Sequence, residues 1–145
     1  MKPRSLLIAI LALAGFAVST YLLTVHWGWW SAVCLGVGDC ELVNTSRFSE
    51  FLGIPVALLG MVSYAAIFVL SLALLRGIEP EWARRGVFAL GAIGVAFSAY
   101  LTYIELFVLH QICPWCVLSA ILITLIAVLS TLELRAAETY ELETE

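Results

Sequence analysis

Four long apolar stretches constrain the fold of this chain more than any other feature. They cover residues 6–25, 54–75, 86–109 and 117–134. A helix that crosses a hydrocarbon core about 30 Å thick needs roughly 20 residues, and each stretch approaches or exceeds that length. Because only helices satisfy all their own backbone hydrogen bonds in lipid, each stretch is predicted to span a membrane as a helix. We therefore expect an all-α integral membrane protein, a four-transmembrane-helix bundle.

Composition supports this fold class and limits the number of domains. The chain has 145 residues, of which 63% are hydrophobic and 12% charged, whereas soluble domains have about 45–50% apolar and about 25% charged residues. One membrane domain, residues 1–135, and an acidic cytoplasmic tail, residues 136–145, account for the whole length. Any soluble partner domain is expected on a separate polypeptide. The net charge of −4 argues against nucleic-acid binding.

The first apolar stretch has an alternative interpretation as a cleaved signal peptide. Lys2 and Arg4 precede it, as cationic residues do in such peptides. The apolar run continues without a break through Tyr21, Leu22 and Leu23. That length is unusual for the apolar part of a signal peptide, so a membrane span is favoured.

The cationic residues predict how the bundle is oriented. They gather at the amino terminus, in the second loop and just after the last stretch: Lys2, Arg4, Arg76, Arg84, Arg85 and Arg135. Only Arg47 lies in the other two loops, residues 26–53 and 110–116. By the positive-inside rule, both termini face the cytoplasm and these two loops lie on the extracytoplasmic side of the cell membrane.

The long outer loop has the composition of an ordered segment. Trp27, Trp29 and Trp30 are typical of an aromatic anchor at the membrane surface. Further along, apolar and polar residues alternate in a pattern that favours a short, half-buried interfacial helix. Its apolar members are Leu42, Val43, Phe48, Phe51 and Leu52, and its polar members are Asn44, Ser46, Ser49 and Glu50.

The four cysteines form two close pairs, both in the outer loops. Cys34 and Cys40 are separated by a segment that contains Gly36 and Gly38, which we interpret as a mobile hinge. Cys113 and Cys116 form a Cys-Pro-Trp-Cys motif. This spacing lets two thiols close and reopen a small disulfide ring while the pKa of one of them is lowered. The extracytoplasmic side, where the pairs are predicted to lie, is also where disulfides persist.

The inner pair should stand at the beginning of the last helix. Pro114 suits the first helical turn, because its missing N–H would have no partner there. The positive end of the helix dipole then lies near Cys113 and Cys116. The sequence leaves open which of these two thiols has the lowered pKa.

Two cysteine pairs on one side of a membrane predict a redox relay. Thiol–disulfide exchange moves two electrons from one pair to the other. No haem, flavin, iron–sulfur or dinucleotide motif is present to accept them, which favours a quinone dissolved in the bilayer. The alternatives are static structural disulfides, a zinc site made of all four cysteines, and a channel or transporter subunit. The last usually needs polar residues along a path through the membrane, and the chain has almost none.

The motifs together resemble the vitamin K epoxide reductase family, in its bacterial branch. The resemblance rests on the spacing of Cys34 and Cys40, on Ser46, on the segment Gly53-Ile54-Pro55-Val56-Ala57-Leu58-Leu59-Gly60 with Tyr64 after it, and on the Cys-Pro-Trp-Cys motif that heads the last helix. The other quinone-linked thiol oxidase family of four-helix membrane proteins has its Cys-x-x-Cys motif in the first outer loop. In this chain that motif lies in the second outer loop.

The resemblance implies a role for each cysteine. Cys116 would lie next to a quinone and reduce it, Cys113 would exchange with Cys40, and Cys34 would meet a partner protein. Ser46 matches a serine or threonine that the family places near the active site. The quinone would be a menaquinone, a ubiquinone or a vitamin K form. Because no thioredoxin-like domain is fused to the chain, the partner would be a separate thioredoxin-like protein.

The sequence departs from the animal members at two positions. Val56 and Ala120 stand where those enzymes have an asparagine and a tyrosine that bind the ligand's oxygens. The resemblance therefore implies reduction of an ordinary quinone rather than of an epoxide. Glu105 lies inside the third apolar stretch, and an ionisable residue there is a functional candidate. We consider Glu105, His26 and His110 as proton donors to the quinone, with Glu105 as a further cofactor-binding candidate.

Overall fold

Four long helices form the body of the part of the chain that the computed structural model describes, residues 3–31, 33–34, 36, 38–77 and 81–145. They are α1 (Pro3–His26), α3 (Val56–Leu75), α4 (Glu81–Ile104) and α5 (Pro114–Thr144). All four are long and apolar enough to cross a membrane, with the third span running on to Leu109. Helix α1 packs against α3 and α5, and α4 packs against α5 and α3. The prediction of four helices that are long and apolar enough to span a membrane is confirmed.

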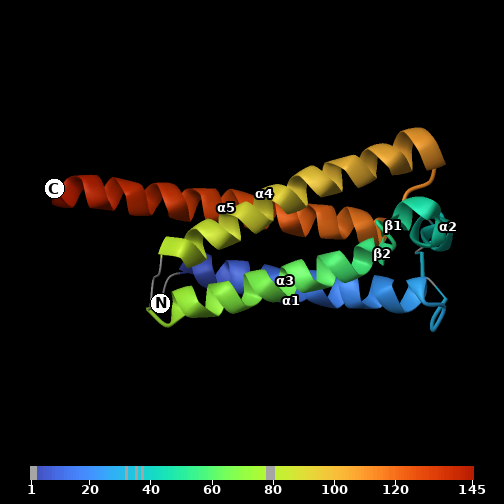
Figure 1. Cartoon of the computed structure of the whole chain (residues 1–145), viewed down its shortest axis with the longest axis horizontal. Helices are drawn as coiled ribbons and strands as arrows, with labels where there is room; N and C mark the ends of the chain where they lie inside the picture. The colour runs from blue at the N-terminus through green and yellow to red at the C-terminus, as the bar shows by residue number, and fades with distance from the viewer. Residues whose placement is uncertain (1–2, 32, 35, 37, 78–80) are drawn as a thin grey trace.

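The helices begin and end near the predicted boundaries, with one large exception. Helix α5 continues past residue 134 to Thr144, so the residues that we predicted as an acidic tail form its last turns and project from the bundle at the C-terminal end in Figure 1. This segment contains no glycine or proline, and its alanine, leucine and glutamate residues favour helix. At the other end, Pro114 occupies the first helical turn as predicted.

The first outer loop differs from its prediction. The short helix α2 covers only Cys40–Thr45, followed by the 3-10 turn η1 (Arg47–Ser49) and the strands β1 (Glu50–Phe51) and β2 (Ile54–Pro55). The prediction of one helix that includes Phe48, Phe51 and Leu52 is therefore wrong, and the fold is mostly rather than purely helical. Whether α2 lies in the membrane interface stays a prediction.

A tight hairpin explains why the predicted helix stops. Strands β1 and β2 pair antiparallel, with Phe51 opposite Ile54. The two residues between them, Leu52 and Gly53, have φ values of 54° and 81°, as in a type I′ turn. Gly53 adopts this conformation without steric cost. Sequence periodicity alone does not reveal such a turn when its first residue is a leucine.

Two apolar clusters form the core. One lies in the middle of the bundle and includes Ile8, Tyr64, Ile67, Val87 and Ile126. There Gly15 of α1 faces the ring of Tyr64, and any side chain at that position would overlap the ring. The second cluster lies toward the loop end and includes Val18, Leu22, Cys40, Val43, Cys113 and Leu122. This second cluster brings one cysteine of each pair into the same buried core.

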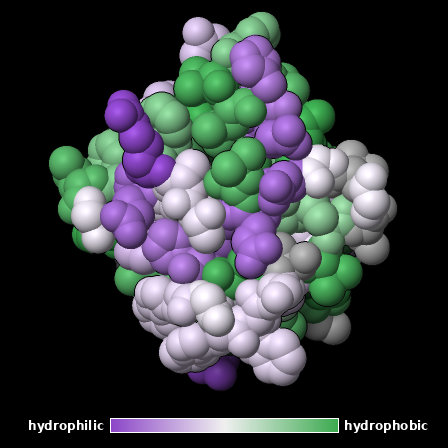
Figure 2. All heavy atoms as spheres, turned by 90° about the vertical axis from the view of Figure 1, so that its right-hand side faces the viewer, coloured by the Kyte–Doolittle hydropathy of each residue, from purple (hydrophilic) through white to green (hydrophobic). Residues whose placement is uncertain are grey.

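The two ends of the bundle differ in chemistry. Figure 1 shows α2, β1 and β2 at one end of the bundle, and both chain termini, the end of α3 and the start of α4 at the other. The arginines at the start of α1, at the end of α3 and at the start of α4 lie at the terminal end: Arg4, Arg76, Arg84 and Arg85. Figure 2, which faces the loop end, shows polar residues across its middle and apolar residues around them. All four cysteines belong to this loop end.

Candidate active site

The outer cysteine pair forms a disulfide at the beginning of α2. Cys34 and Cys40 are bonded, with their Cα atoms 5.8 Å apart. Asp39 caps α2, because its side chain accepts a hydrogen bond from the Leu42 N–H at 2.9 Å. The Cys40 side chain is only 1% exposed, whereas Cys34 is half-buried. Of the two sulfurs, that of Cys34 therefore lies nearer to the surface.

The outer loop is docked onto the turn that precedes α5. The indole Nε1–H of Trp115 donates a hydrogen bond to the Val33 carbonyl at 2.7 Å, and the Val33 N–H donates to the Tyr21 hydroxyl at 2.9 Å. The rings of Tyr21 and Trp115 are 5.1 Å apart. Gly38 lies so close to the Ile112 carbonyl that a Cβ there would overlap it. These contacts hold the loop disulfide beside the Cys-Pro-Trp-Cys motif.

Gly38→Ala is expected to lift the loop from this turn, so that Cys113 becomes at least about tenfold more reactive toward a maleimide, since a buried thiol reacts only after local opening. Gly36→Ala is the matched control. Gly36 and Gly38 share the left-handed conformation, with φ values of 77° and 68°, but nothing lies within 4 Å of a Cβ at Gly36. Mass spectrometry of labelled peptides measures the effect, and equal labelling of the two variants would contradict it.

The inner pair consists of two free thiols at the start of α5. Cys113 is the N-cap residue and is fully buried, whereas Cys116 lies in the first turn and is half-buried. A hydrogen bond from the Cys116 thiol holds the pKa of Cys113 below its ordinary value, and the backbone N–H groups of Trp115 and Cys116 act in the same direction. Burial and the Glu105 charge oppose this shift. Of the two thiols that the sequence did not distinguish, Cys113 is therefore the one whose pKa is lowered by its donors.

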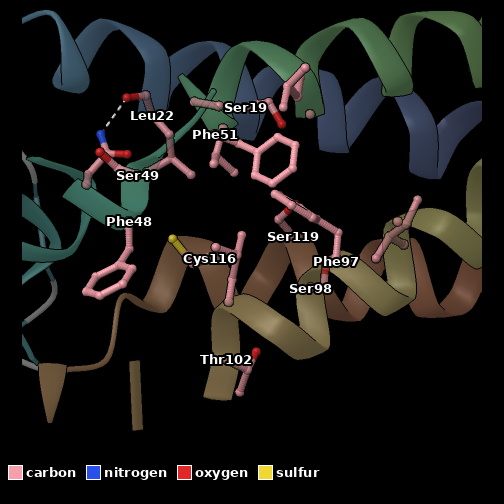
Figure 3. Close-up of a pocket in the computed structure, with 18 of the residues that line it drawn as sticks. Ser19, Leu22, Phe48, Ser49, Phe51, Phe97, Ser98, Thr102, Cys116 and Ser119 are labelled. Carbon is pink, nitrogen blue, oxygen red and sulfur yellow. Dashed lines mark hydrogen bonds between the residues drawn. The ribbon is translucent and has the colours of Figure 1, made fainter. Parts of the chain in front are cut away.

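The two inner cysteines face different surroundings. Cys113 is a buried member of the cluster that contains Cys40, and Cys116 and Cys34 pack against that cluster. Cys116 lines a cavity between the helices, and Figure 3 shows its sulfur pointing from α5 toward that space. Both inner cysteines therefore lie beside the outer disulfide, and Cys116 also lies beside the cavity.

The cavity has a volume of about 390 Å³. All four long helices contribute to its walls, and residues of α2, η1 and β1 cover it at the loop end. Its surface is mainly apolar, with a few hydroxyl and amide groups. Phe51 from the hairpin and Phe97 from α4 pack edge to face there, with ring centroids 5.8 Å apart. Small-molecule sites have this character, apolar walls with a few polar groups that fix orientation.

The lining residues fit a quinone, which the family resemblance implied as electron acceptor. A quinone has a flat, largely apolar ring with two carbonyl oxygens. Phe48, Phe51 and Phe97 supply aromatic surface, and Ser46, Asn44 and Ser119 supply polar groups. Cys116 would supply the reducing sulfur. These residues would hold such a molecule beside Cys116.

The other predicted site residues fall into two groups. Ser46 and Glu105 both line the cavity, and the Ser46 hydroxyl also donates a hydrogen bond to the Val43 carbonyl at 2.9 Å. His26 and His110 are not among the described cavity-lining residues. His26 instead joins α1 to the loop, since its Nδ1 lies 2.7 Å from the Asn44 carbonyl oxygen and its Nε2 lies 3.3 Å from the Glu50 carboxylate.

Sequence reasoning missed several residues around the cavity. Asn44 was assigned to the polar face of the loop, yet it is only 7% exposed and its side-chain amide donates to the Leu22 carbonyl at 2.6 Å. Tyr64 donates to the Ser119 carbonyl at 2.8 Å. No sequence signal marks Asn44, because a buried polar residue in a short helix looks like a solvent-facing one. Of the two positions that differ from the animal enzymes, Val56 lines the cavity and Ala120 is not among the described lining residues.

A metal centre is not evident at this site. Within the described ranges, no group of three or more His, Cys, Asp or Glu side chains is arranged to hold a metal ion. Two of the four cysteines are joined in a disulfide and so offer no thiolate ligands in this state.

A four-helix membrane bundle with a dithiol beside a disulfide, and with an apolar cavity at one of the thiols, defines the class of membrane thiol oxidoreductases. The comparison with family models agrees. The model of the vitamin K epoxide reductase family matches residues 6–131, nearly the whole chain, and the protein belongs to this family. Members of the family are quinone-linked redox enzymes. The chain is therefore a redox enzyme of the oxidoreductase kind.

Proposed function

We propose that the protein is a membrane thiol:quinone oxidoreductase. It takes two electrons from the dithiol of a separate thioredoxin-fold protein and passes them to a membrane quinone, which supports disulfide formation outside the cytoplasm. The observation that carries the proposal is the divided position of the inner dithiol. Cys113 is a buried member of the cluster with Cys40 of the outer pair, while Cys116 packs against that cluster and also lines the apolar cavity.

Electrons enter through the outer pair. A partner thiolate attacks Cys34, the more accessible sulfur of the outer disulfide, and a mixed disulfide forms as Cys40 leaves. The second partner thiol then attacks the partner sulfur of that bond. The partner becomes a disulfide, and Cys34 and Cys40 become thiols. The low exposure of Cys40, 1%, keeps soluble proteins away from it.

The same chemistry then moves the electrons inward. The Cys40 thiolate attacks Cys113 of the oxidised inner pair, and Cys116 leaves. Cys34 next attacks Cys40, so the outer disulfide closes again and Cys113 is released. The lowered pKa of Cys113 makes it a good leaving group in this step. The outcome is the state seen in the structure, a closed outer disulfide beside two free inner thiols.

The inner dithiol is then ready to reduce the acceptor. The bound quinone accepts two electrons and two protons and becomes a hydroquinone, while the Cys113–Cys116 disulfide re-forms. Cys116 faces the acceptor, the apolar walls exclude water, and the covering segment of α2, η1 and β1 separates the site from the surface. The thiols supply both protons overall, so the reaction balances without another reactant.

We propose that the cysteine end of the bundle faces the extracytoplasmic space. Arginines lie at the end of the bundle that carries both termini, and the cysteines lie at the opposite end. The positive-inside rule places the arginine end in the cytoplasm. The partner then meets Cys34 in the extracytoplasmic space, where disulfide exchange operates.

Static disulfides and a zinc site fit the structure less well. A static function gives no reason for a cavity at Cys116 or for a pair of free thiols beside a closed disulfide. A zinc site made of all four cysteines needs four thiolates that converge as a tetrahedron. In this state the outer two are bonded to each other.

Anaerobic quinone reduction by purified protein in detergent tests the proposed function. Wild type and Cys34→Ser are each supplied with a small dithiol or with a reduced thioredoxin-fold protein, and a short-chain ubiquinone or menaquinone is followed by absorbance. With the small dithiol, we expect Cys34→Ser to stay within about threefold of wild type, because that reductant reaches the inner pair directly. With the protein reductant, we expect at least about a 50-fold loss.

A variant with all four cysteines changed to serine shows the uncatalysed rate in the same micelles. If monodisperse wild-type protein matches that variant with every reductant and both quinones, the oxidoreductase proposal is wrong, and zinc analysis of the same sample tests the metal alternative.

A further inference from the structure

Glu105 organises the turn that leads to the inner cysteines. It begins the π-helical segment η2 (Glu105–Leu109) at the end of α4. Its backbone carbonyl accepts the N–H groups of His110 and of Gln111, the latter at 3.0 Å. Its side-chain Oε2 accepts the Cys113 N–H at 3.3 Å. π-helical turns often occur at functional sites, and here one brings a carboxylate to the start of another helix.

The Glu105 side chain also contacts the cysteine that faces the cavity. Its carboxylate interacts with the Cys116 thiol, it lines the same cavity, and it is only 5% exposed. A buried carboxylate inside a membrane span is unfavourable unless donors surround it. The Cys113 N–H and the positive end of the α5 dipole partly offset that cost. Glu105 is therefore a buried acid held beside the cavity-facing thiol.

Few other groups near the cavity exchange protons. Within the described lining set, the ionisable side chains are Glu105, Cys116 from α5 and Tyr64 from α3. The Tyr64 hydroxyl donates to the Ser119 carbonyl, and a phenol is too weak an acid for ready exchange at neutral pH. Cys113 is not among the described lining residues, and its backbone N–H donates a hydrogen bond to the Glu105 carboxylate. No lysine, arginine or histidine is among these described residues.

We propose that Glu105 is a catalytic proton carrier for the cavity-facing thiol, a role that rests on the proposed quinone reduction. The Glu105 carboxylate accepts the proton of Cys116 Sγ as the Cys113–Cys116 bond forms and two electrons pass to the quinone, while the Cys113 thiol supplies the second proton. The carboxylic acid then releases this proton to the reduced quinone oxygen. Glu105 ends the cycle ionised, and the overall reaction remains one dithiol and one quinone giving one disulfide and one hydroquinone.

Glu105→Gln separates proton transfer from a structural role. The glutamine oxygen still accepts the Cys113 N–H, and the backbone carbonyl of the residue still binds the turn, but an amide does not carry the proton. Glu105→Asp retains a carboxylate on a shorter side chain. Glu133→Gln is the matched control, because Glu133 also accepts a side-chain hydrogen bond within the bundle, from Ser5 at 2.5 Å, at the end away from the cysteines.

Two measurements are made on each protein with all four cysteines present. The first is single-turnover quinone reduction by the reduced enzyme. The second uses no quinone and measures how fast iodoacetamide alkylates Cys116, resolved from Cys113 by mass spectrometry. We expect Glu105→Gln to slow quinone reduction by about 100-fold, since general acid–base groups contribute roughly that much or more. Alkylation of Cys116 should become several-fold faster, because a neighbouring negative charge that opposes thiolate formation is removed.

These opposite changes distinguish a proton carrier from a residue that only holds the turn. Glu105→Asp should recover at least about a tenth of the wild-type rate, and Glu133→Gln should match wild type in both measurements. Quinone reduction within threefold of wild type in Glu105→Gln, or slower reduction with unchanged Cys116 alkylation, would overturn the role of Glu105. Absence of quinone reduction in the wild type would instead overturn the proposed function itself.

Discussion

Cys116→Ser is expected to lower the rate of quinone reduction by at least about 1,000-fold, whichever dithiol supplies the electrons, as loss of an enzyme nucleophile generally does. Cys116 is the one cysteine among the described lining residues of the cavity, and a hydroxyl cannot form a disulfide with Cys113. A small reductant can reduce the inner pair without Cys34, but no reductant replaces the Cys116 sulfur that reduces the quinone. Stopped-flow absorbance of the quinone measures the loss.

Ser119→Ala is the matched control for this prediction. Ser119 lines the same cavity from the same helix, one turn further along, and its hydroxyl lies 3.0 Å from that of Tyr64. A change at this position alters the cavity wall without removing a redox group, so turnover should remain within about tenfold of wild type, as for other losses of a single hydrogen bond. Substantial dithiol-driven turnover in Cys116→Ser would show that another group reduces the quinone.

The spans were predictable because lipid leaves so few alternatives. A run of about 20 apolar residues in a membrane must be helical, and the structure has helices over all four predicted stretches. Pro114 likewise marked the start of α5 correctly. The end of α5 was missed because a charged segment outside the membrane can be helical or irregular, and neither lipid nor a breaking residue decides between them.

In the outer loop, the alternation of polar and apolar residues did not predict which side chains are buried. Asn44 and Leu42 were assigned to faces by alternation, but Asn44 is buried against the Leu22 carbonyl and Leu42 is 46% exposed. In a membrane protein, an exposed apolar residue and a buried polar one are both acceptable, because the first can meet lipid and the second can find a backbone partner. Polarity alone therefore predicts orientation poorly in this loop.

The different surroundings of Cys113 and Cys116 could be seen only in the three-dimensional structure. Both lie in one turn of the sequence motif, and either thiol would be near the helix dipole. Both side chains pack in or against the cluster with Cys40, and the distinction is that Cys116, unlike Cys113, is among the described residues that line the cavity. Glu105 is a similar case, since its distance along the sequence, eight residues before Cys113, gives no sign of the hydrogen bond between them. The sequence marked these residues, and their neighbours determine their chemistry.

The double variant Cys34→Ser/Cys116→Ser is expected to trap the step that joins the two pairs. It keeps only Cys40 and Cys113, which share the buried cluster, and mild oxidation should bond them within each molecule. The comparison variant Cys34→Ser/Cys113→Ser keeps Cys40 and Cys116, of which the latter faces the cavity. Because a disulfide needs Cβ atoms about 4 Å apart, the first bond should form at least about tenfold faster. Peptide mass spectrometry without reductant measures both.

The trapped bond distinguishes a relay from two independent redox pairs. If electrons pass between Cys40 and Cys113, these sulfurs must reach bonding distance in the folded protein, and the bond should form at equal rate in dilute and concentrated samples. Bonding that rises with protein concentration would indicate contacts between molecules. Faster bonding of Cys40 to Cys116 would reverse the proposed order, because the cavity-facing sulfur would then meet the outer pair and Cys113 would have no route to the acceptor.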